Sequence, residues 1–206
     1  MKMAIIGATG YTGSRILTEA LDRGHAVTAI VRDIEKLPTH SRLTAAECDV
    51  TDQASLSSLL PGNTVVVSAF NPGNDETGKG INSIIQAVKH ASARLVVVGG
   101  AGSLEVVSGQ RLVDQPNFPS AWKDGALKTA AFLEILRCEH ELDWSFVSPA
   151  AKLSPGKRTG EYRVGGDHLL TDEDGESHIS VEDFAVAMLD EIEQPIHRRT
   201  RFSVAY

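Results

Sequence analysis

The sequence predicts an α/β fold in which helices cover both faces of a doubly wound, mostly parallel sheet. Short apolar runs recur along residues 1–150, segments of helical period separate them, and a glycine-rich loop follows the first run. Strands that are apolar along their whole length are buried on both faces, as in a parallel sheet. Strands that alternate with helices are typical of connected βαβ units.

The predicted strands are the runs Met3–Ile6, Ala26–Val31, Leu43–Ala46, Thr64–Val67, Arg94–Val98 and Trp144–Val147. Apolar spacing and capping residues predict helices from about Ser14 to Arg23, from Thr51–Asp52 to Leu60, around Ile81–Val88 and from Ala126 to Arg137. Ser180 is the expected N-cap of a last helix, and Arg201–Tyr206 is the expected closing strand.

The length of 206 residues predicts a single domain. Residues 149–180 are rich in glycine and charge, and we expect them to form a substrate-side lobe within that domain, with a short hairpin around Gly165–Gly166. Tyr162 and Leu169 supply apolar side chains to this lobe, which argues against disorder.

Composition excludes several classes of partner. The net charge is −7, which disfavours nucleic acid, and the basic run 197–201 is interpreted as a solvated approach to the last strand. We expect a cytoplasmic protein that does not bind membranes, because no export segment or spanning run is visible. Cys48 and Cys138 are expected to be reduced, buried thiols. No histidine or cysteine spacing predicts a metal.

A GxxGxxG loop lies between the first predicted strand and the first helix. Its glycines allow a sharp turn and a close approach of backbone N–H groups to a pyrophosphate, which the helix N-terminus also favours. This position at the start of a βαβ chain predicts a dinucleotide site. The residues expected to bind the cofactor here are Gly7, Thr9, Gly10, Tyr11, Thr12 and Gly13.

The end of the second strand indicates which dinucleotide binds. Arg32 is suited to the 2′-phosphate of NADP, whereas Asp33 is suited to the 2′-hydroxyl of NAD. Because Arg32 comes first, NADP is favoured and NAD stays open. Ligands bind beyond the carboxyl ends of parallel strands, so further contacts are expected from Asp49, with a helix cap as an equal alternative, and from Val50, Ser68, Ala69, Phe70, Gly99 and Pro149.

Several longer strings carry a family resemblance over nearly the whole chain. GATGYTGSRI, VTAIVRD, VVGGAGSLEV, DWSFVSPA, PGKRTGEYRVGGDHLL and SHISVEDFAVAMLDE resemble the bacterial NADH-flavin reductases, atypical members of the short-chain dehydrogenase superfamily. The chain is also similar to biliverdin reductase B and, more distantly, to NmrA-like regulators. The resemblance implies an NAD(P)-binding Rossmann fold and suggests reduction of a flavin or quinone.

The chain departs from the wider superfamily at the proton donor. Ordinary members use Tyr-x-x-x-Lys, in which the lysine lowers the pKa of the tyrosine. None of the three tyrosines here has a lysine four residues on, and Asp124 is the residue four before Lys128. Carbonyl reduction by that relay, and with it sugar-nucleotide epimerisation, is therefore disfavoured.

Flavin reduction needs no tuned acid, because hydride passes from nicotinamide C4 to flavin N5 and a proton can come from solvent. The flavin would be a substrate and not a tightly bound group. Phe118, Trp122 and Tyr162 are the candidates for its pocket, with core packing as the alternative for each. Ser103, Lys123 and Lys128 are the candidates for catalytic contacts, and a loop end or solvated helix charges are the alternatives.

Two functions therefore compete. One is an NAD(P)H-dependent flavin or quinone reductase. The other is a non-catalytic NAD(P)-binding redox sensor of the NmrA-like type, which would discriminate oxidised from reduced cofactor without turnover. The sequence leaves a homodimer open in either case.

Overall fold

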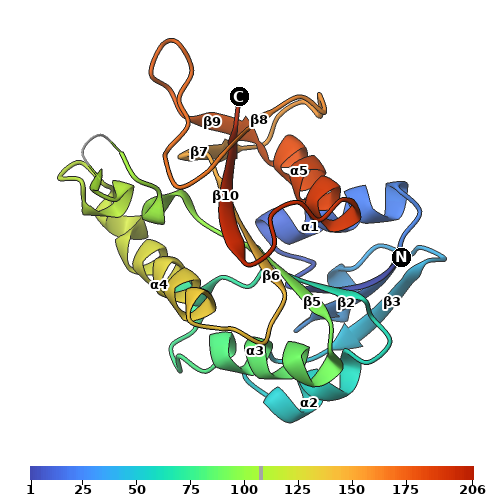
Figure 1. Cartoon of the computed structure of the whole chain (residues 1–206). Helices are drawn as coiled ribbons and strands as arrows, with labels where there is room; N and C mark the ends of the chain where they lie inside the picture. The colour runs from blue at the N-terminus through green and yellow to red at the C-terminus, as the bar shows by residue number, and fades with distance from the viewer. Residues whose placement is uncertain (107–108) are drawn as a thin grey trace.

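The computed structural model describes residues 1–106 and 109–206, and its main feature is an eight-stranded sheet (Figure 1). The strand order is β3-β2-β1-β4-β5-β6-β10-β8, and every neighbouring pair is parallel except β10 and β8. The strands span Lys2–Ile6 (β1), Ala26–Val31 (β2), Leu43–Glu47 (β3), Val65–Ser68 (β4), Arg94–Val98 (β5), Trp144–Pro149 (β6), Arg163–Gly165 (β8) and Thr200–Ala205 (β10). The predicted doubly wound α/β fold is confirmed.

Helices form a layer on each face of the sheet (Figure 1). One layer consists of α1 (Tyr11–Asp22) and α5 (Val181–Glu193), and the other of α2 (Gln53–Leu59), α3 (Gly80–Ala91) and α4 (Ser120–Arg137). A hydrophobic core lies on each face of the sheet, between the strands and the helices. The strands contribute to both cores because successive side chains point to opposite faces. In β1, Met3 and Ile5 join the core under α1 and α5, while Ala4 and Ile6 join the other.

The chain changes direction across the sheet between β1 and β4, which are hydrogen-bonded neighbours. From β1 the chain moves outward through β2 to β3, and it then returns to β4 and proceeds the other way. The connections that follow β1 and β4 therefore run to opposite sides of the sheet, and doubly wound folds bind ligands in the crevice that such a reversal leaves at the carboxyl edge.

Two predicted helix starts are wrong, for the same reason. Helix α1 begins at Tyr11 and not near Ser14, with Gly10 as its extended N-cap. Helix α4 begins at Ser120, six residues before Ala126, because Pro119 supplies an extended cap. In both helices the first turn adds no aliphatic side chain to the core, and so it lacks the apolar spacing that predicted the remainder.

The expected hairpin around Gly165–Gly166 is wrong as well. Strand β8 pairs with β10, so that Val164 lies opposite Val204. The nearby strands β7 (Lys152–Ser154) and β9 (His178–Ser180) pair in parallel in a separate small sheet. All of these pairings join segments that are distant in the sequence. A pair of glycines indicates only a local turn, so it could not predict them.

Two expectations about surface residues also need correction. Cys48 is buried as expected, but Cys138 is exposed at the end of α4. The basic run 197–201 is only partly solvated, because Arg201 is buried and pairs with Asp167, and the His197 ring stacks on Phe202 at 4.0 Å. No helix among the described residues combines the length and the apolar character needed to cross a membrane.

The segment 156–160 is held against α5 by the fully buried carboxylate of Asp183. That carboxylate accepts hydrogen bonds from the backbone N–H groups of Thr159 at 2.8 Å and Gly160 at 2.7 Å, and from the Tyr206 hydroxyl. Burial acts to raise the pKa of Asp183, but the hydrogen bonds from Tyr206 and Thr159 outweigh it and hold the pKa below its ordinary value.

We predict that Asp183→Asn lowers the free energy of unfolding at pH 7 by about 3 kcal/mol, because donors that face a carboxylate would meet an amide. A lowered folded pKa stabilises the protein above the unfolded pKa and loses that effect as pH falls through the folded pKa. The difference between wild type and variant should therefore shrink below about pH 4. Urea denaturation at several pH values measures it, with Glu173→Gln in an exposed turn as control. A pH-independent difference would contradict the prediction.

Candidate dinucleotide site at the carboxyl edge

The loop between β1 and α1 is packed so closely that two of its glycines have no room for a side chain. Gly7 adopts φ +78°, and a Cβ there would lie 2.9 Å from the carbonyl oxygen of Ala69. A Cβ on Gly13 would lie 2.1 Å from the carbonyl oxygen of Gly7. These contacts bring the first turn of α1 onto the end of β1.

The N-terminus of α1 is left open toward the crevice. Its N-cap is Gly10, which has no side chain to cap the helix, and the first intrahelical bond runs from Ser14 N–H to Gly10 O at 2.9 Å. The N–H groups of Tyr11, Thr12 and Gly13 precede that bond and have no partner within the helix. An open helix N-terminus beside a glycine turn suits a pyrophosphate.

The structure separates the roles of the two charged residues after β2. Asp33 accepts a hydrogen bond from Glu35 N–H at 3.1 Å and pairs with Lys36 at 2.9 Å. The bond from Lys36 is the main reason why the pKa of Asp33 is lowered. Arg32 is exposed and forms no ion pair with any residue that the structure describes. The guanidinium is therefore available to a ligand, whereas the carboxylate is occupied.

Asp49 lies at the same edge as Arg32, because β2 and β3 pair in parallel and both residues follow the ends of their strands. The charge of Arg32 contributes to lowering the pKa of Asp49. The larger cause is hydrogen bonding from Thr51, whose backbone N–H and hydroxyl donate to Asp49 at 2.8 and 2.7 Å. The cap of α2 is Asp52 and not Asp49. Val50 is half-buried against the core beneath α2 and α3.

The predicted cofactor-binding residues that follow β4 have two kinds of role in the structure. Ala69 makes backbone contacts with the glycine loop, whereas the side chains of Phe70 and Ser68 are directed into the protein. Ala69 supports Gly7, and its N–H donates to Ile6 O at 2.9 Å. The Phe70 ring packs against α3, where a Cβ on Gly80 would lie 2.5 Å from it. Ser68 is fully buried, and its hydroxyl has no hydrogen-bond partner within residues 1–106 and 109–206. The Phe70 ring is therefore half-buried against the core beneath α3.

Glycines also follow β5, and the start of α4 packs onto them. A Cβ on Gly102 would lie 2.9 Å from Cβ of Ala126, and one on Gly100 would lie 3.3 Å from the methyl carbon of Thr129. Trp122 lies one helical turn before Ala126 on the same inner face. Unlike Ala126, however, Trp122 is 67% exposed. The first turn of the helix therefore leaves an indole mostly exposed to solvent.

Two further predicted residues adjoin these glycines. Gly99 leaves room for the Phe146 ring, which would lie 2.3 Å from a Cβ at that position. Pro149 is buried as the last residue of β6, opposite Val204. Both are at the carboxyl edge of the sheet.

Ser103 has a partner that the sequence analysis missed. Its hydroxyl accepts a hydrogen bond from Nη1 of Arg201 at 3.4 Å, and Nε of Arg201 donates to Asp167 at 2.7 Å. A hydroxyl that accepts from a guanidinium keeps its own proton for another acceptor. The basic run 197–201 was the only available signal, and nothing in it distinguished Arg201 from its exposed neighbours.

The structure does not bring the two candidate lysines into contact with Ser103. Lys123 is exposed near the start of α4. Lys128 forms an i,i+4 ion pair with Asp124 at 3.1 Å, in which Asp124 is exposed and Lys128 is half-buried. The spacing that corresponds to Tyr-x-x-x-Lys is therefore occupied by a surface ion pair.

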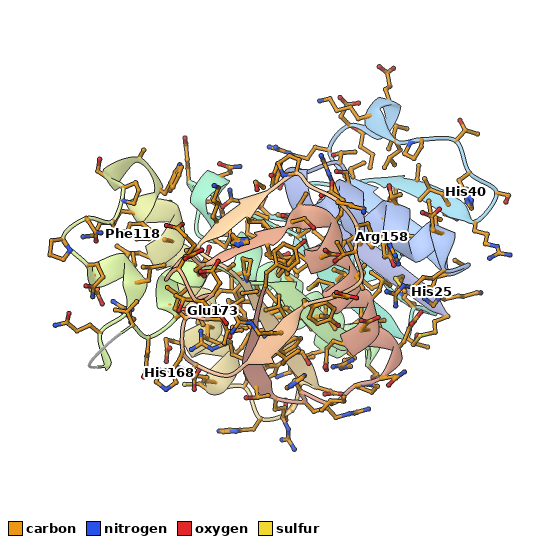
Figure 2. The ribbon with its side chains drawn as sticks, turned by 90° about the horizontal axis from the view of Figure 1, so that it is seen from above. His25, His40, Phe118, Arg158, His168 and Glu173 are labelled. Atoms are coloured by element: carbon orange, nitrogen blue, oxygen red, sulfur yellow. The ribbon has the colours of Figure 1, made fainter. Side chains whose placement is uncertain are left out.

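Tyr162 lies away from the other pocket candidates. Its hydroxyl donates to Asp190 at 2.5 Å, and Asp190 pairs with Arg23 just beyond the C-terminal end of α1. Helix α1 rises roughly 18 Å between the glycine loop and that end. Figure 2 shows Phe118 on the α4 side of the molecule and Arg158, in the segment leading to Tyr162, on the other side. Burial is the main cause of the raised pKa of Tyr162.

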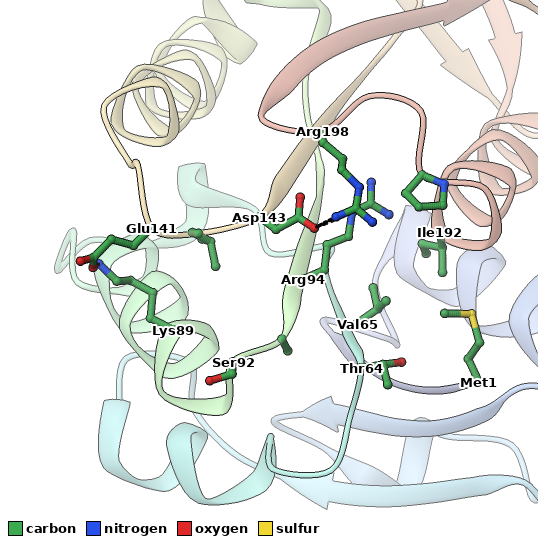
Figure 3. Close-up of a pocket in the computed structure, with 13 residues that line it drawn as sticks. Met1, Thr64, Val65, Lys89, Ser92, Arg94, Glu141, Asp143, Ile192 and Arg198 are labelled. Atoms are coloured by element: carbon green, nitrogen blue, oxygen red, sulfur yellow. Dashed lines mark hydrogen bonds and ion pairs between the residues drawn. The ribbon is translucent and has the colours of Figure 1, made fainter.

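A cavity of about 580 Å³ lies at the opposite, amino edge of the sheet (Figure 3). Its charged residues are largely paired with neighbouring chain residues. Arg198 donates to Asp143 at 2.6 Å, Lys89 pairs with Glu141 at 2.8 Å, and Arg94 pairs with Glu191. The cavity is therefore separate from the crevice after β1 and β4.

Together, the sheet reversal, the glycine loop and the open helix N-terminus define a nucleotide-binding Rossmann protein. A family model described as NAD(P)H-binding matches residues 7–195. The chain belongs to this NAD(P)H-binding family, and its relatives support an NAD(P)H oxidoreductase.

Relatives match the chain over its full length. The uncharacterized protein YwnB of Bacillus subtilis is 42% identical over 213 residues, covering 99% of this chain and 98% of YwnB. A structure from Bacteroides thetaiotaomicron, described as a proposed epimerase, is 45% identical with a TM-score of 0.95, covering 100% of this chain and 96% of that one. A structure described as a proposed NADH-flavin reductase, from Streptococcus pneumoniae, is 35% identical with a TM-score of 0.85, covering 100% and 99%.

We predict that Gly13→Ala weakens NADPH binding at least about tenfold, because the new methyl group forces the helix away from the loop that it contacts. Quenching of nucleotide fluorescence measures the affinity, and circular dichroism reports whether the fold is retained. Gly166→Ala is the matched control, since a Cβ there meets nothing within 4 Å. A Gly13→Ala variant that binds NADPH as the wild type does would contradict the prediction.

Proposed function

We propose that this chain reduces a planar flavin or quinone-like acceptor with NADPH. The observation that carries the proposal is the exposed indole of Trp122, one helical turn before Ala126, the residue of α4 that packs on Gly102. This position would form one wall of a flat site at the carboxyl edge. An aromatic wall binds a conjugated ring by stacking, and it offers little to a small aliphatic carbonyl compound.

The backbone beneath Trp122 suits such a ring. Gly100 and Gly102 carry no side chains, so the backbone after β5 lies directly against α4. The inner face of α4 closes that space at Ala126 and Thr129, which contact the glycines, and leaves it open at Trp122. A flat ring between the indole and the nicotinamide position would be shielded from water on both faces.

The acid chemistry of the site also favours this acceptor class. When bound, the reduced nicotinamide supplies a hydride. The chain has Asp124, not tyrosine, four residues before Lys128, so a carbonyl oxygen would lack the usual donor. A flavin takes its proton from solvent. Ser103 keeps its proton while it accepts from Arg201, and it could donate a hydrogen bond to a polar atom of the ring.

The choice of NADPH over NADH rests on Arg32. Its guanidinium is exposed at the end of β2, and Asp33, the competing ligand for a ribose hydroxyl, is held by Lys36 and by Glu35 N–H. A guanidinium binds a phosphate through two parallel hydrogen bonds. The 2′-phosphate is the group that NADP has and NAD lacks.

We predict that Arg32→Ala weakens NADPH binding about 10- to 100-fold, equal to ~1.4–2.8 kcal/mol, and leaves NADH binding within about twofold. Titration of both nucleotides by fluorescence measures the ratio. Asp33→Asn is the control and should change neither affinity greatly. Equal loss of both nucleotides would show that Arg32 does not contact the 2′-phosphate.

The activity is tested by the fall in absorbance at 340 nm when NADPH is mixed with FMN, FAD, riboflavin or a quinone. We predict turnover, and we predict that Trp122→Ala raises KM for the acceptor about tenfold with unchanged NADPH affinity, since one stacking wall is lost. Val164→Ala, at another exposed apolar residue, is the matched control. Tight NADPH binding without turnover on any acceptor would instead favour the redox-sensor function.

A further inference from the structure

Helix α4 has a second apolar face, directed away from the core. Leu127, Ala131, Ile135 and Cys138 are exposed and recur at spacings of four, four and three residues, so they share one side of the helix. Leu127 is 39% exposed and Ile135 is 48% exposed. The opposite side is buried in the core through Ala130, Leu133 and Leu136. We call the exposed set the α4 stripe.

The α4 stripe is symmetric about its centre. Ala131 is small, and Leu127 and Ile135 lie four residues to either side of it. The charged residues that flank the stripe are also related in this way, because Lys128 and Glu134 lie three residues before and after Ala131 and have opposite charges. A face with this arrangement matches a copy of itself turned through 180°.

We propose that the α4 stripe binds a second copy of the chain, with the two α4 helices antiparallel and crossing at Ala131. In that arrangement Leu127 packs against the partner's Ile135, and Lys128 faces the partner's Glu134. Each contact occurs twice, as an isologous two-fold interface requires. A small residue at the crossing lets the two helices approach closely.

The polar neighbours of the α4 stripe permit this pairing. Lys128 pairs with Asp124 at 3.1 Å, and Glu134 pairs with Arg137 at 2.8 Å. Both pairs are at the surface, where exposed ion pairs rearrange at little cost. A single helix face buries less than the roughly 800 Å² per partner of a standard interface, so the dimer should dissociate on dilution.

Sedimentation equilibrium tests the proposal with two matched variants. We expect the wild type to approach twice the mass of one chain at high concentration and to return to one chain on dilution. Ile135→Asp should stay a single chain throughout, because it places two carboxylates in the apolar contact. Ile196→Asp changes a more exposed isoleucine outside α4 and should behave as the wild type. A wild type that stays a single chain, or two variants that behave alike, would overturn the proposal.

A cysteine at the crossing point tests the geometry directly. Helices packed about 8–10 Å apart, each with its Cα atoms at ~2.3 Å from the axis, bring facing Cα atoms to about 3.4–5.4 Å, and the upper part of that range allows a disulfide. In a Cys138→Ser background, Ala131→Cys should form a cross-linked pair under mild oxidation. Ala54→Cys, on the exposed side of α2, should not. A wild-type dimer without the Ala131→Cys cross-link would overturn the antiparallel arrangement.

The dimer proposal is independent of the reductase proposal. Trp122 is on the inner side of α4, and the stripe is on the outer side. Ile135→Asp should therefore keep the NADPH affinity of the wild type, and a failure of either proposal leaves the other standing.

Discussion

The contact between the helix α1 backbone at Gly13 and the carbonyl oxygen of Gly7 is the constraint on which the rest of the site depends. With a hydrogen atom in place of a side chain, α1 begins directly above the end of β1, and its free N–H groups face the crevice. The same turn presses Gly7 against Ala69, which joins the ends of β1 and β4 at the point where the sheet reverses. The close packing of this glycine turn thus sets the position of the positive end of the α1 dipole, and it also sets which residues form the floor of the crevice.

Two carboxylates hold the segment 158–160, which lies farther from the glycine loop, against helices α1 and α5. Asp183 secures residues 159 and 160 on α5, and Glu19 in α1 holds Arg158 at 2.7 Å. Both carboxylates bind the middle of a segment with little apolar content, so hydrogen bonds and an ion pair replace the hydrophobic packing that fixes the strands. This arrangement explains why PGKRTGEYR folds in an ordered way without forming the hairpin that its glycines suggested.

The sequence predicted the parallel strands nearly to the residue, because a strand buried on both faces is apolar throughout and needs no partner to be recognised. Features that depend on a distant residue could not be predicted in this way. Arg201 resembled its exposed neighbours until Asp167, 34 positions away, was seen beside it. Phe70 was expected to contact the cofactor and Tyr162 the acceptor, and only the structure shows that Phe70 packs against Gly80 and that Tyr162 bonds to Asp190.

The two faces of helix α4 have different roles. Along its inner face, small residues at 126 and 129 match the glycines after β5, and the sudden change to an exposed indole at Trp122 marks where the core ends and a ligand site can begin. Along its outer face, no core explains the apolar residues, so their symmetry about Ala131 needs a reason outside the chain. The buried face of a helix is fixed by packing against the core, whereas an exposed apolar face indicates contact with a partner. The helical period places the two sets of residues on opposite sides of α4, so each set can serve its own contact.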